Sequence, residues 1–365
     1  MWLIARPSLF EIAGSFMELL FKWQHVRSRM KGLTFDDVLI VPSKTDMRSR
    51  KDPSLKTQLT RNYSLDLPII SANMDTITES DMAIAMANLG GLGILHRFMT
   101  IEEQIQHVRA IRKANVNLIS ASIGVNDDFR DRAKKLVDAG VQILTIDIAH
   151  GHSVQMLETM KWCKDNFPKI DIIAGNVATP EATEELIEAG ADAIKVGIGP
   201  GSMCTTRIIT GAGVPQLTAV ALCAEVGKEK GVPIIADGGI KTSGDIVKAL
   251  SGGANVVMLG SMLSGTIETP GEIKNGRKNY RGMASRSAQD SWRGGVPEGM
   301  APEGESTTVS VKGHVKDVIM ELSGGIRSGM TYVNASTVDE LCEKARFIEM
   351  STSGMNESRA HGLNK

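Results

Sequence analysis

The sequence has almost no excess of either charge, and it contains few cysteines. Among its 365 residues, 41 basic and 42 acidic side chains give a formal net charge of −1 at pH 7. No overall field favours nucleic acid or an anionic membrane as the partner, so a small molecule is expected instead. The four cysteines are widely spaced and form no C-x-x-C pair, which argues against a disulfide scaffold or a zinc site and fits a reducing cytoplasm.

A long uninterrupted apolar run is also missing. Residues 1–30 are rich in apolar side chains between Trp2 and Trp23. Their runs are interrupted by Arg6, Pro7, Glu11, Glu18 and Lys22. The segment is therefore a poor membrane span, and it has no small-residue cleavage site after a basic start. We expect an N-terminal extension over residues 1–30, forming an amphipathic packing helix, and a single domain over residues 31–365.

From residue 67 onward, strand-like segments alternate with helix-like amphipathic ones. The strand-like segments are LPIISANMD (67–75), GLGIL (91–95), LISASIG (118–124), VQILTIDIAH (141–150), IDIIAGNVA (170–178), AIKVGIGPG (193–201), VPIIADGG (232–239) and NVVMLGS (255–261). Helices are expected at 81–89, 101–113, 127–139, 154–166, 181–189, 218–230 and 243–250. This alternation is typical of a parallel sheet covered by helices. Eight strands of this kind predict an α/β protein with a closed (β/α)8 TIM barrel.

The loops that follow the strands of such a barrel are where catalytic residues lie. Here these loops carry Asn73, Met74, Asp75, His96, Arg97, Asp147, His150, His152, Asn176, Asp237, Gly238, Gly239, Gly260 and Ser261. The DGG and LGS sequences follow the last two strands, where barrels commonly bind phosphate. Their small residues allow backbone N–H groups to approach an anion.

The stretch KVGIGPGSMCTTRIIT (195–210) combines a glycine-rich turn with a cysteine. Its glycines let the backbone turn tightly and expose N–H groups. Cys204 follows at once, near the hydroxyls of Thr205 and Thr206 and the cation of Arg207. Taken alone, a cysteine is more often a small buried apolar residue, but a loop at the end of a strand with these neighbours favours a thiolate nucleophile.

The segment from residue 268 to 310 is long and rich in Gly, Pro and Ser. Long loops in a compact fold are usually functional or disordered. The aromatic, methionine and carboxylate content of this one predicts a mobile lid over the active site. We call it the flap. After it, helices are expected at 315–322 and 338–346, with a turn at GGIRSGM between them.

Several motifs together resemble one family. They are TFDDVLIVP, ISANMDTIT, GNVAT, GIGPGSMCTTR, IADGGI, VMLGSMLSG, YRGM and GGIRSGM. From about Leu33 onward the chain resembles the IMP dehydrogenase and GMP reductase family over nearly its whole length. The resemblance implies a barrel that forms homotetramers and acts on GMP or IMP with a nicotinamide cofactor. It also implies a covalent thioimidate between Cys204 and C2 of the purine.

The same resemblance implies roles for individual residues. The nucleotide would be bound by Met74, Ser202, Asp237, Gly239, Gly260, Ser261, Tyr280, Gly282, Met283 and Ala284. Among these, Asp237 would hold the ribose hydroxyls, and hydroxyls and backbone N–H groups would hold the phosphate. Asp147, Asn176 and Gly197 would line the nicotinamide side. The carbonyls of Gly199, Gly201 and Cys204 correspond to a potassium site, completed by a neighbouring subunit's tail that resembles Glu357 and Ser358.

The two family reactions both transfer a hydride at C2 of the purine and differ in the second step. In the dehydrogenase an Arg-Tyr pair on the flap activates water, whereas the reductase releases ammonia with a Thr-Glu pair, matched here by Thr206 and Glu303. No Arg-Tyr pair occurs between residues 280 and 312. The flap has the short reductase length, and no insert of paired CBS modules separates residues 97 and 122. These features favour an NADPH-dependent GMP reductase.

Other features of the sequence resemble the dehydrogenase. They are Arg97, the DIAHGHS run, GGIRSGM and the ESRAHG tail. NAD-dependent oxidation of IMP to XMP is therefore the alternative activity. A barrel that binds purine nucleotides without turnover is a minor alternative, although Cys204, Thr206, Asp147 and Glu303 are all present.

Overall fold

The computed structural model describes residues 31–126 and 128–358. The helix expected within residues 1–30 and most of the ESRAHG tail lie outside the described residues. No helix in the described ranges is both long and apolar enough to cross a membrane.

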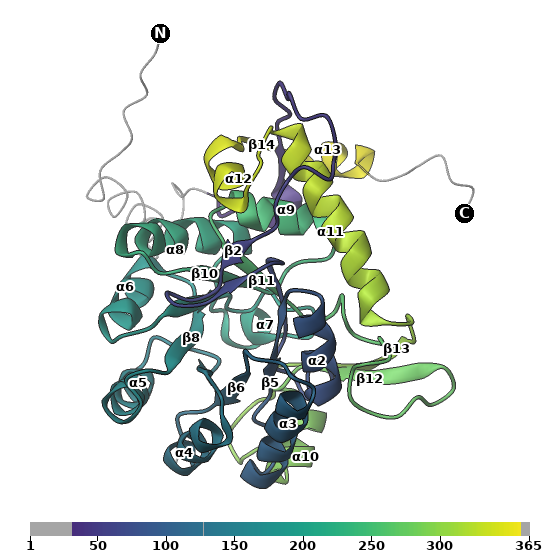
Figure 1. The fold of residues 1–365 in the computed structure, drawn as a ribbon. Coiled ribbons are helices and arrows are strands. Elements are labelled where there is room, and N and C mark those ends of the chain that lie inside the picture. The colour runs from purple at the N-terminus through teal and green to yellow at the C-terminus, as the bar shows by residue number, and fades with distance from the viewer. Residues whose placement is uncertain (1–30, 127, 359–365) are drawn as a thin grey trace, which may run out of the picture.

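Eight parallel strands close into a barrel, as the sequence predicts (Figure 1). They are β4 (Ile69–Ser71), β5 (Leu92–Leu95), β6 (Ser120–Ile123), β7 (Ile143–Asp147), β8 (Asp171–Val177), β9 (Ala193–Val196), β10 (Ile234–Asp237) and β11 (Val256–Leu259). The strands pair in chain order, and β11 closes the ring on β4, with Val257 opposite Ile69. Nearly every strand residue is buried, because helices cover the outside of the barrel and side chains fill its interior.

Helices occupy the connections between the strands. They are α2 (Ser80–Asn88), α3 (Ile101–Lys113), α4 (Phe129–Ala139), α5 (Val154–Asn166), α6 (Pro180–Glu188), α7 (Thr206–Thr210), α8 (Gln216–Lys230) and α9 (Ser243–Ser251). Four of them begin at a hydroxyl side chain that accepts a backbone N–H three residues later, namely Thr100, Ser153, Thr179 and Thr242. These caps fix where each helix begins and therefore where the preceding loop ends. The short helix α7, directly after Cys204, is not among the helices expected from the sequence.

A short hairpin covers the amino-terminal end of the barrel. It consists of β2 (Thr57–Gln58) and β3 (Ser64–Leu65). Thr57 donates to the carbonyl of Asn255, just before β11 (2.8 Å), and Asn62 donates to Asp171 at the start of β8 (2.8 Å). With this end covered, the loops at the opposite end form the mouth of the barrel.

Segments from the two ends of the described chain meet beside the barrel. A short 3-10 helix, η2 (Phe35–Asp37), leads into β1 (Val38–Ile40), which pairs antiparallel with β14 (Phe347–Glu349). The carboxyl-terminal part also contains α12 (Val338–Lys344) and α13 (Thr352–Glu357).

The expected turn at GGIRSGM is wrong. Helix α11 runs without a break over Val315–Tyr332, although glycines usually weaken a helix. Two of its glycines face α9: a Cβ added at Gly325 would lie 2.2 Å from the Ser243 hydroxyl, and one at Gly329 would lie 2.7 Å from Val247. The close packing of two helices, which sequence propensity does not include, therefore outweighs the tendency to break.

The flap contains regular structure rather than an irregular lid. Strands β12 (Arg277–Arg281) and β13 (Ser306–Ser310) form an antiparallel pair, and helix α10 (Arg286–Arg293) lies between them in sequence. Arg281 forms an ion pair with Asp75 after β4 and donates to the Ser287 carbonyl in α10 (2.8 Å). These contacts attach the flap to the barrel. No additional domain separates α3 from β6, because α3 ends at Lys113 and β6 begins at Ser120.

Candidate active site

One cavity of about 620 Å³ opens at the carboxyl ends of the barrel strands. Residues at the carboxyl ends of all the barrel strands except β6, or in the loops that follow these strands, line it, together with residues of the flap. Its size falls within the range of about 300–1,000 Å³ that small-molecule sites occupy. The barrel thus places the loops identified from the sequence around a common space.

The Cys204 loop enters this cavity from the end of β9. Gly197 has a φ of 153°, and a Cβ there would lie 2.0 Å from the carbonyl oxygen of Asp237. Only glycine permits this approach between the loops after β9 and β10. Cys204 is a free, half-buried cysteine whose N–H donates to the Gly201 carbonyl (3.0 Å). The turn therefore presents the thiol to the cavity.

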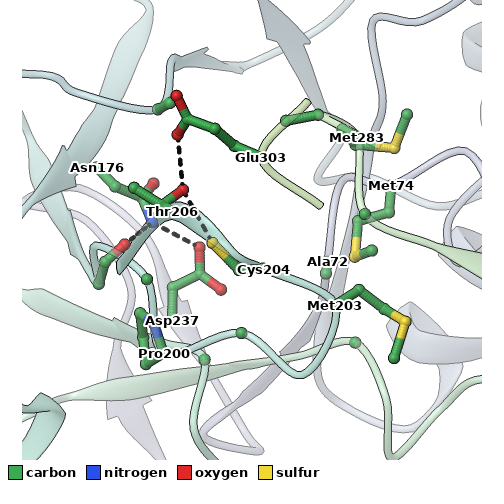
Figure 2. A pocket seen from close by; sticks show the side chains of 18 of the residues that line it. Ala72, Met74, Asn176, Pro200, Met203, Cys204, Thr206, Asp237, Met283 and Glu303 are labelled. Carbon is green, nitrogen blue, oxygen red and sulfur yellow. Dashed lines mark hydrogen bonds between the residues drawn. The ribbon is translucent and has the colours of Figure 1, made fainter. Parts of the chain in front are cut away.

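A chain of hydrogen bonds leads away from the thiol (Figure 2). The Cys204 thiol donates to the Thr206 hydroxyl, with 3.1 Å between Sγ and Oγ1, and that hydroxyl donates to Oε2 of Glu303 (2.8 Å). The backbone fixes Glu303 as well, because its N–H donates to the Ala284 carbonyl (3.0 Å) and its carbonyl accepts from the N–H of Thr205 (3.2 Å). The arrangement can pass a proton between sulfur and carboxylate through one hydroxyl.

Hydroxyls and glycines gather on another side of the cavity. The Ser202 hydroxyl lies 2.9 Å from the Tyr280 hydroxyl, and burial raises the pKa of Tyr280, so the phenol stays protonated and can donate. Gly239 has a φ of 80°. Gly260 leaves room for its neighbours, since a Cβ there would lie 3.4 Å from the Tyr280 oxygen. Donors without a fixed cation are suited to hold a phosphate.

Lys195 lies at the bottom of the cavity, between Asp147 and Asp237. Its side chain is 2% exposed, and its ammonium donates to Asp147 Oδ1 (2.8 Å), Asp237 Oδ2 (2.9 Å) and the side-chain oxygen of Asn176. Burial works against the charge on Lys195, but the attraction of both carboxylates raises its pKa. Burial likewise opposes the charge on Asp147, and Lys195 with Arg97 lowers the pKa of that carboxyl. Lys195 and Asp147 therefore both stay ionised.

Three buried polar atoms that line the cavity have no hydrogen-bond partner among the described residues. They are Arg97 Nε, Gln289 Oε1 and Trp292 Nε1. The rings of Phe98 and Trp292 lie beside them, 5.2 Å apart. Buried donors and acceptors without partners are costly. Their presence next to aromatic rings fits a ligand that carries an amide on a flat ring and hydroxyl groups on an attached sugar, as a nicotinamide nucleotide does.

Apart from Glu357 and Ser358, all residues predicted to act on the substrate, cofactor or cation line this cavity. What each of them binds stays a prediction. The side chain of Asp75 instead pairs with Arg281, and His152 pairs with Glu185 (2.6 Å). His96, His150 and His152 do not line the cavity.

The sequence reasoning did not select Lys195 as a site residue. A signal was available, because it is the charged residue in the otherwise apolar run AIKV at the end of which the cysteine loop begins. Gln289 and Trp292 were also not predicted to be site residues. They lie on a helix of the flap, and the barrel pattern indicates only the loops that follow strands.

The potassium prediction concerns backbone oxygens in the Cys204 turn. In the described ranges, no three His, Cys, Asp or Glu side chains are grouped so that they could hold a metal ion. Carbonyl oxygens such as those of Gly199, Gly201 and Cys204 are suited to an alkali cation. Glu357 of the same chain ends α13 and does not line the cavity.

Comparisons with known proteins agree with this geometry. The family model described as "IMP dehydrogenase / GMP reductase domain" matches residues 32–361. The inosine-5'-monophosphate dehydrogenase of Cryptosporidium parvum is 44% identical over 91% of this chain and 96% of its own length. That of Borreliella burgdorferi is 39% identical over 91% of this chain and 97% of its own length.

A solved structure is also similar. It is a GMP reductase variant from Trypanosoma brucei in complex with guanosine 5'-monophosphate. It has a TM-score of 0.88 and 34% sequence identity, and the match covers 94% of this chain and 100% of the other.

Proposed function

Because the chain belongs to the IMP dehydrogenase and GMP reductase family, we propose that it catalyses the NADPH-dependent reductive deamination of GMP to IMP and ammonia. The observation that carries this direction is the hydrogen-bonded chain from Cys204 through Thr206 to Glu303. A leaving amine needs a proton, and these hydrogen bonds can deliver one next to the nucleophile.

In this proposal the nucleotide spans the cavity with its purine beside Cys204. The phosphate is held by Ser202, Tyr280 and the N–H groups near Gly239, Gly260 and Ser261, and Asp237 accepts from the ribose hydroxyls. On the far side of the purine lie Met74 and Met283, which face Cys204 across the pocket in Figure 2. Gly282 and Ala284 line the same side.

The residues then act in sequence. Cys204 gives its proton through Thr206 to Glu303, and its sulfur forms a bond with C2 of the purine. The C2 amine departs as ammonia and takes a proton back along the same path, which leaves a thioimidate on Cys204. When bound, the nicotinamide cofactor supplies the hydride that replaces sulfur at C2, and the released thiolate recovers a proton.

The cofactor side is assigned to Asp147, Asn176 and Gly197. The unpaired atoms of Arg97, Gln289 and Trp292 give a polar cofactor further partners at this end of the cavity. Potassium is assigned to the carbonyls of Gly199, Gly201 and Cys204, and exchanging potassium for sodium in the assay should lower turnover. A cytoplasmic location belongs to the same proposal.

The second candidate is the NAD-dependent oxidation of IMP to XMP. The names of the curated relatives favour it, since the proteins from Cryptosporidium and Borreliella are both IMP dehydrogenases. Against it stands the flap, in which Arg293 follows Trp292 instead of preceding a tyrosine. Arg293 stacks on that ring at 4.4 Å and would have to serve as the base that activates water.

One absorbance measurement distinguishes the candidates. With GMP and NADPH, the reduced-nicotinamide band should fall while ammonia appears in equal amount. Cys204→Ala should abolish this turnover and keep the nucleotide affinity within about tenfold, because the sulfur acts in bond making rather than in docking. A rise of the band with IMP and NAD, without any response to GMP, would establish the dehydrogenase instead.

A further inference from the structure

Lys195 lines the bottom of the cavity and is almost fully buried there. Its three N–H bonds go to side chains at the ends of β7, β8 and β10, on either side of its own strand β9. The ammonium is therefore fully used by Asp147, Asn176 and Asp237. It has no hydrogen left to donate to a ligand.

The same contacts leave part of each carboxylate available. Lys195 and Asn176 both donate to Oδ2 of Asp237, and none of the hydrogen bonds in the described ranges uses Oδ1. A carboxylate that is held by one oxygen presents the other in a fixed direction. Asp147 is held by Oδ1 in the same way.

We propose that Lys195 is a positioning residue, which keeps Asp237 and Asp147 aimed into the cavity and thereby sets the affinity for nucleotide and for cofactor together. This inference rests on the proposed assignment of Asp237 to the nucleotide ribose and of Asp147 to the nicotinamide side. Neither ligand touches the ammonium.

A second buried lysine provides a contrast. Lys278 is 4% exposed, and it donates to the backbone carbonyls of Thr266, Ile267 and Thr269. Its partners are uncharged carbonyls next to the start of the flap, so its removal leaves no carboxylates facing each other. Lys195 instead separates two carboxylates, and its removal leaves two like charges facing each other.

The first test replaces Lys195 by methionine, which keeps the length of the side chain. GMP binding is measured for wild type and Lys195→Met across about pH 5 to 8, where one of two facing carboxylates should retain a proton. We expect at least about a tenfold loss of affinity, because a buried charge pair has lost its partner. The ratio of the GMP dissociation constants of the variant and the wild type should change with pH. The affinity of the variant for NADPH should fall too.

Tyr280 interacts electrostatically with Asp237 and is unchanged in the variant. Arg97 is the other cation that acts on Asp147, and it is unchanged in the variant. Lys278→Met is the matched control, which should lower the melting temperature but leave the affinity ratio independent of pH. An affinity loss in Lys195→Met that is equal at every pH, or no loss, would overturn the proposal.

A charge-balanced double variant distinguishes the proposed role of Lys195 from a folding defect. Lys195→Met combined with Asp147→Asn removes the ammonium and one of the two facing charges. Its GMP affinity should return to within about threefold of Asp147→Asn alone, because Asp237 no longer faces a second carboxylate. A double variant that binds as weakly as Lys195→Met, or that does not fold, would assign Lys195 to the core and refute the proposal.

Wild-type binding separates this inference from the proposed function. If the wild type binds neither GMP nor IMP, the proposed function fails before Lys195 is tested. If it turns over IMP and not GMP, the same comparison is made with IMP, and the positioning role is still decided.

Discussion

At the scale of single residues, Cys204 differs from the other cysteines in its surroundings. Burial raises the pKa of Cys163 and of Cys223 to about 12, so both remain thiols and act as small apolar side chains. Cys204 is half-buried at the cavity and bonded to Thr206. Position, rather than residue type, selects the nucleophile.

Glu303→Gln tests the proton path at this scale. Glutamine has nearly the same shape and can still accept from Thr206, but it cannot take up or return a proton. Ammonia release should slow by about 10²- to 10⁴-fold. For a nucleotide whose C2 substituent leaves without a proton, such as a 2-chloro purine, the release step should slow much less. Rapid-quench kinetics with both substrates would show the difference.

Glu305→Gln is the matched control for this experiment. Glu305 is exposed, and its backbone N–H, which the substitution retains, donates to the Met203 carbonyl (2.8 Å). Its turnover should equal that of the wild type. If Glu303→Gln slowed the reactions of both substrates equally, the carboxylate would have a structural role instead.

At the scale of elements, helix α11 shows how packing decides a structure that local sequence does not. One of its faces carries Gly325 and Gly329, and this face lies directly against α9. Glycine there costs helix propensity, but it allows the two helices to approach closely. Since α9 follows β10 and the Asp237 loop, this packing also supports the mouth of the barrel.

Two neighbouring glycines in α11 give a direct test. A Cβ at Gly325 would lie 2.4 Å from the Ser243 Cβ, whereas a Cβ at Gly324 meets nothing within 4 Å. Gly325→Ala should therefore destabilise the protein by about 1–3 kcal/mol through overpacking. Gly324→Ala should stabilise it by up to about 1 kcal/mol through helix propensity. Thermal or denaturant unfolding measures both, and equal effects would contradict the packing argument.

At the scale of the whole molecule, closure of the barrel is what makes a site. Asp147, Asn176 and Asp237 lie at the carboxyl ends of three strands, and Cys204 lies in the loop after a fourth. A ring of parallel strands brings these ends to one mouth. The flap then adds Glu303 from outside the barrel.

The homotetramer predicted from the family resemblance belongs to this scale. Large apolar side chains remain exposed close to the site, with Ile208 at 83% and Met300 at 60%, and a neighbouring subunit would cover such residues. Sedimentation velocity at micromolar concentration should show a tetramer. A monomer would contradict the prediction, and a chain that begins at Met30 would show whether residues 1–29 are needed for assembly.

The sequence by itself determined the barrel, the position of its loops and the identity of the cysteine loop. These features depend on local patterns, because buried parallel strands need short apolar runs and the helices between them need one apolar face. The segments 67–75 and 193–201, for example, contain β4 and β9. The glycines before Cys204 likewise signalled a tight turn, and the motifs around them carried the family resemblance.

Only the tertiary structure decided which distant groups touch. Thr206 and Glu303 are 97 positions apart and Lys195 and Asp147 are 48 apart, so their contacts depend on strand order and on the path of the flap. The continuous helix α11 also depends on a neighbour, α9, that no local pattern includes. Local propensity contributes little free energy per residue, whereas burial between elements contributes more, so contacts that arise when the chain closes override the local preference.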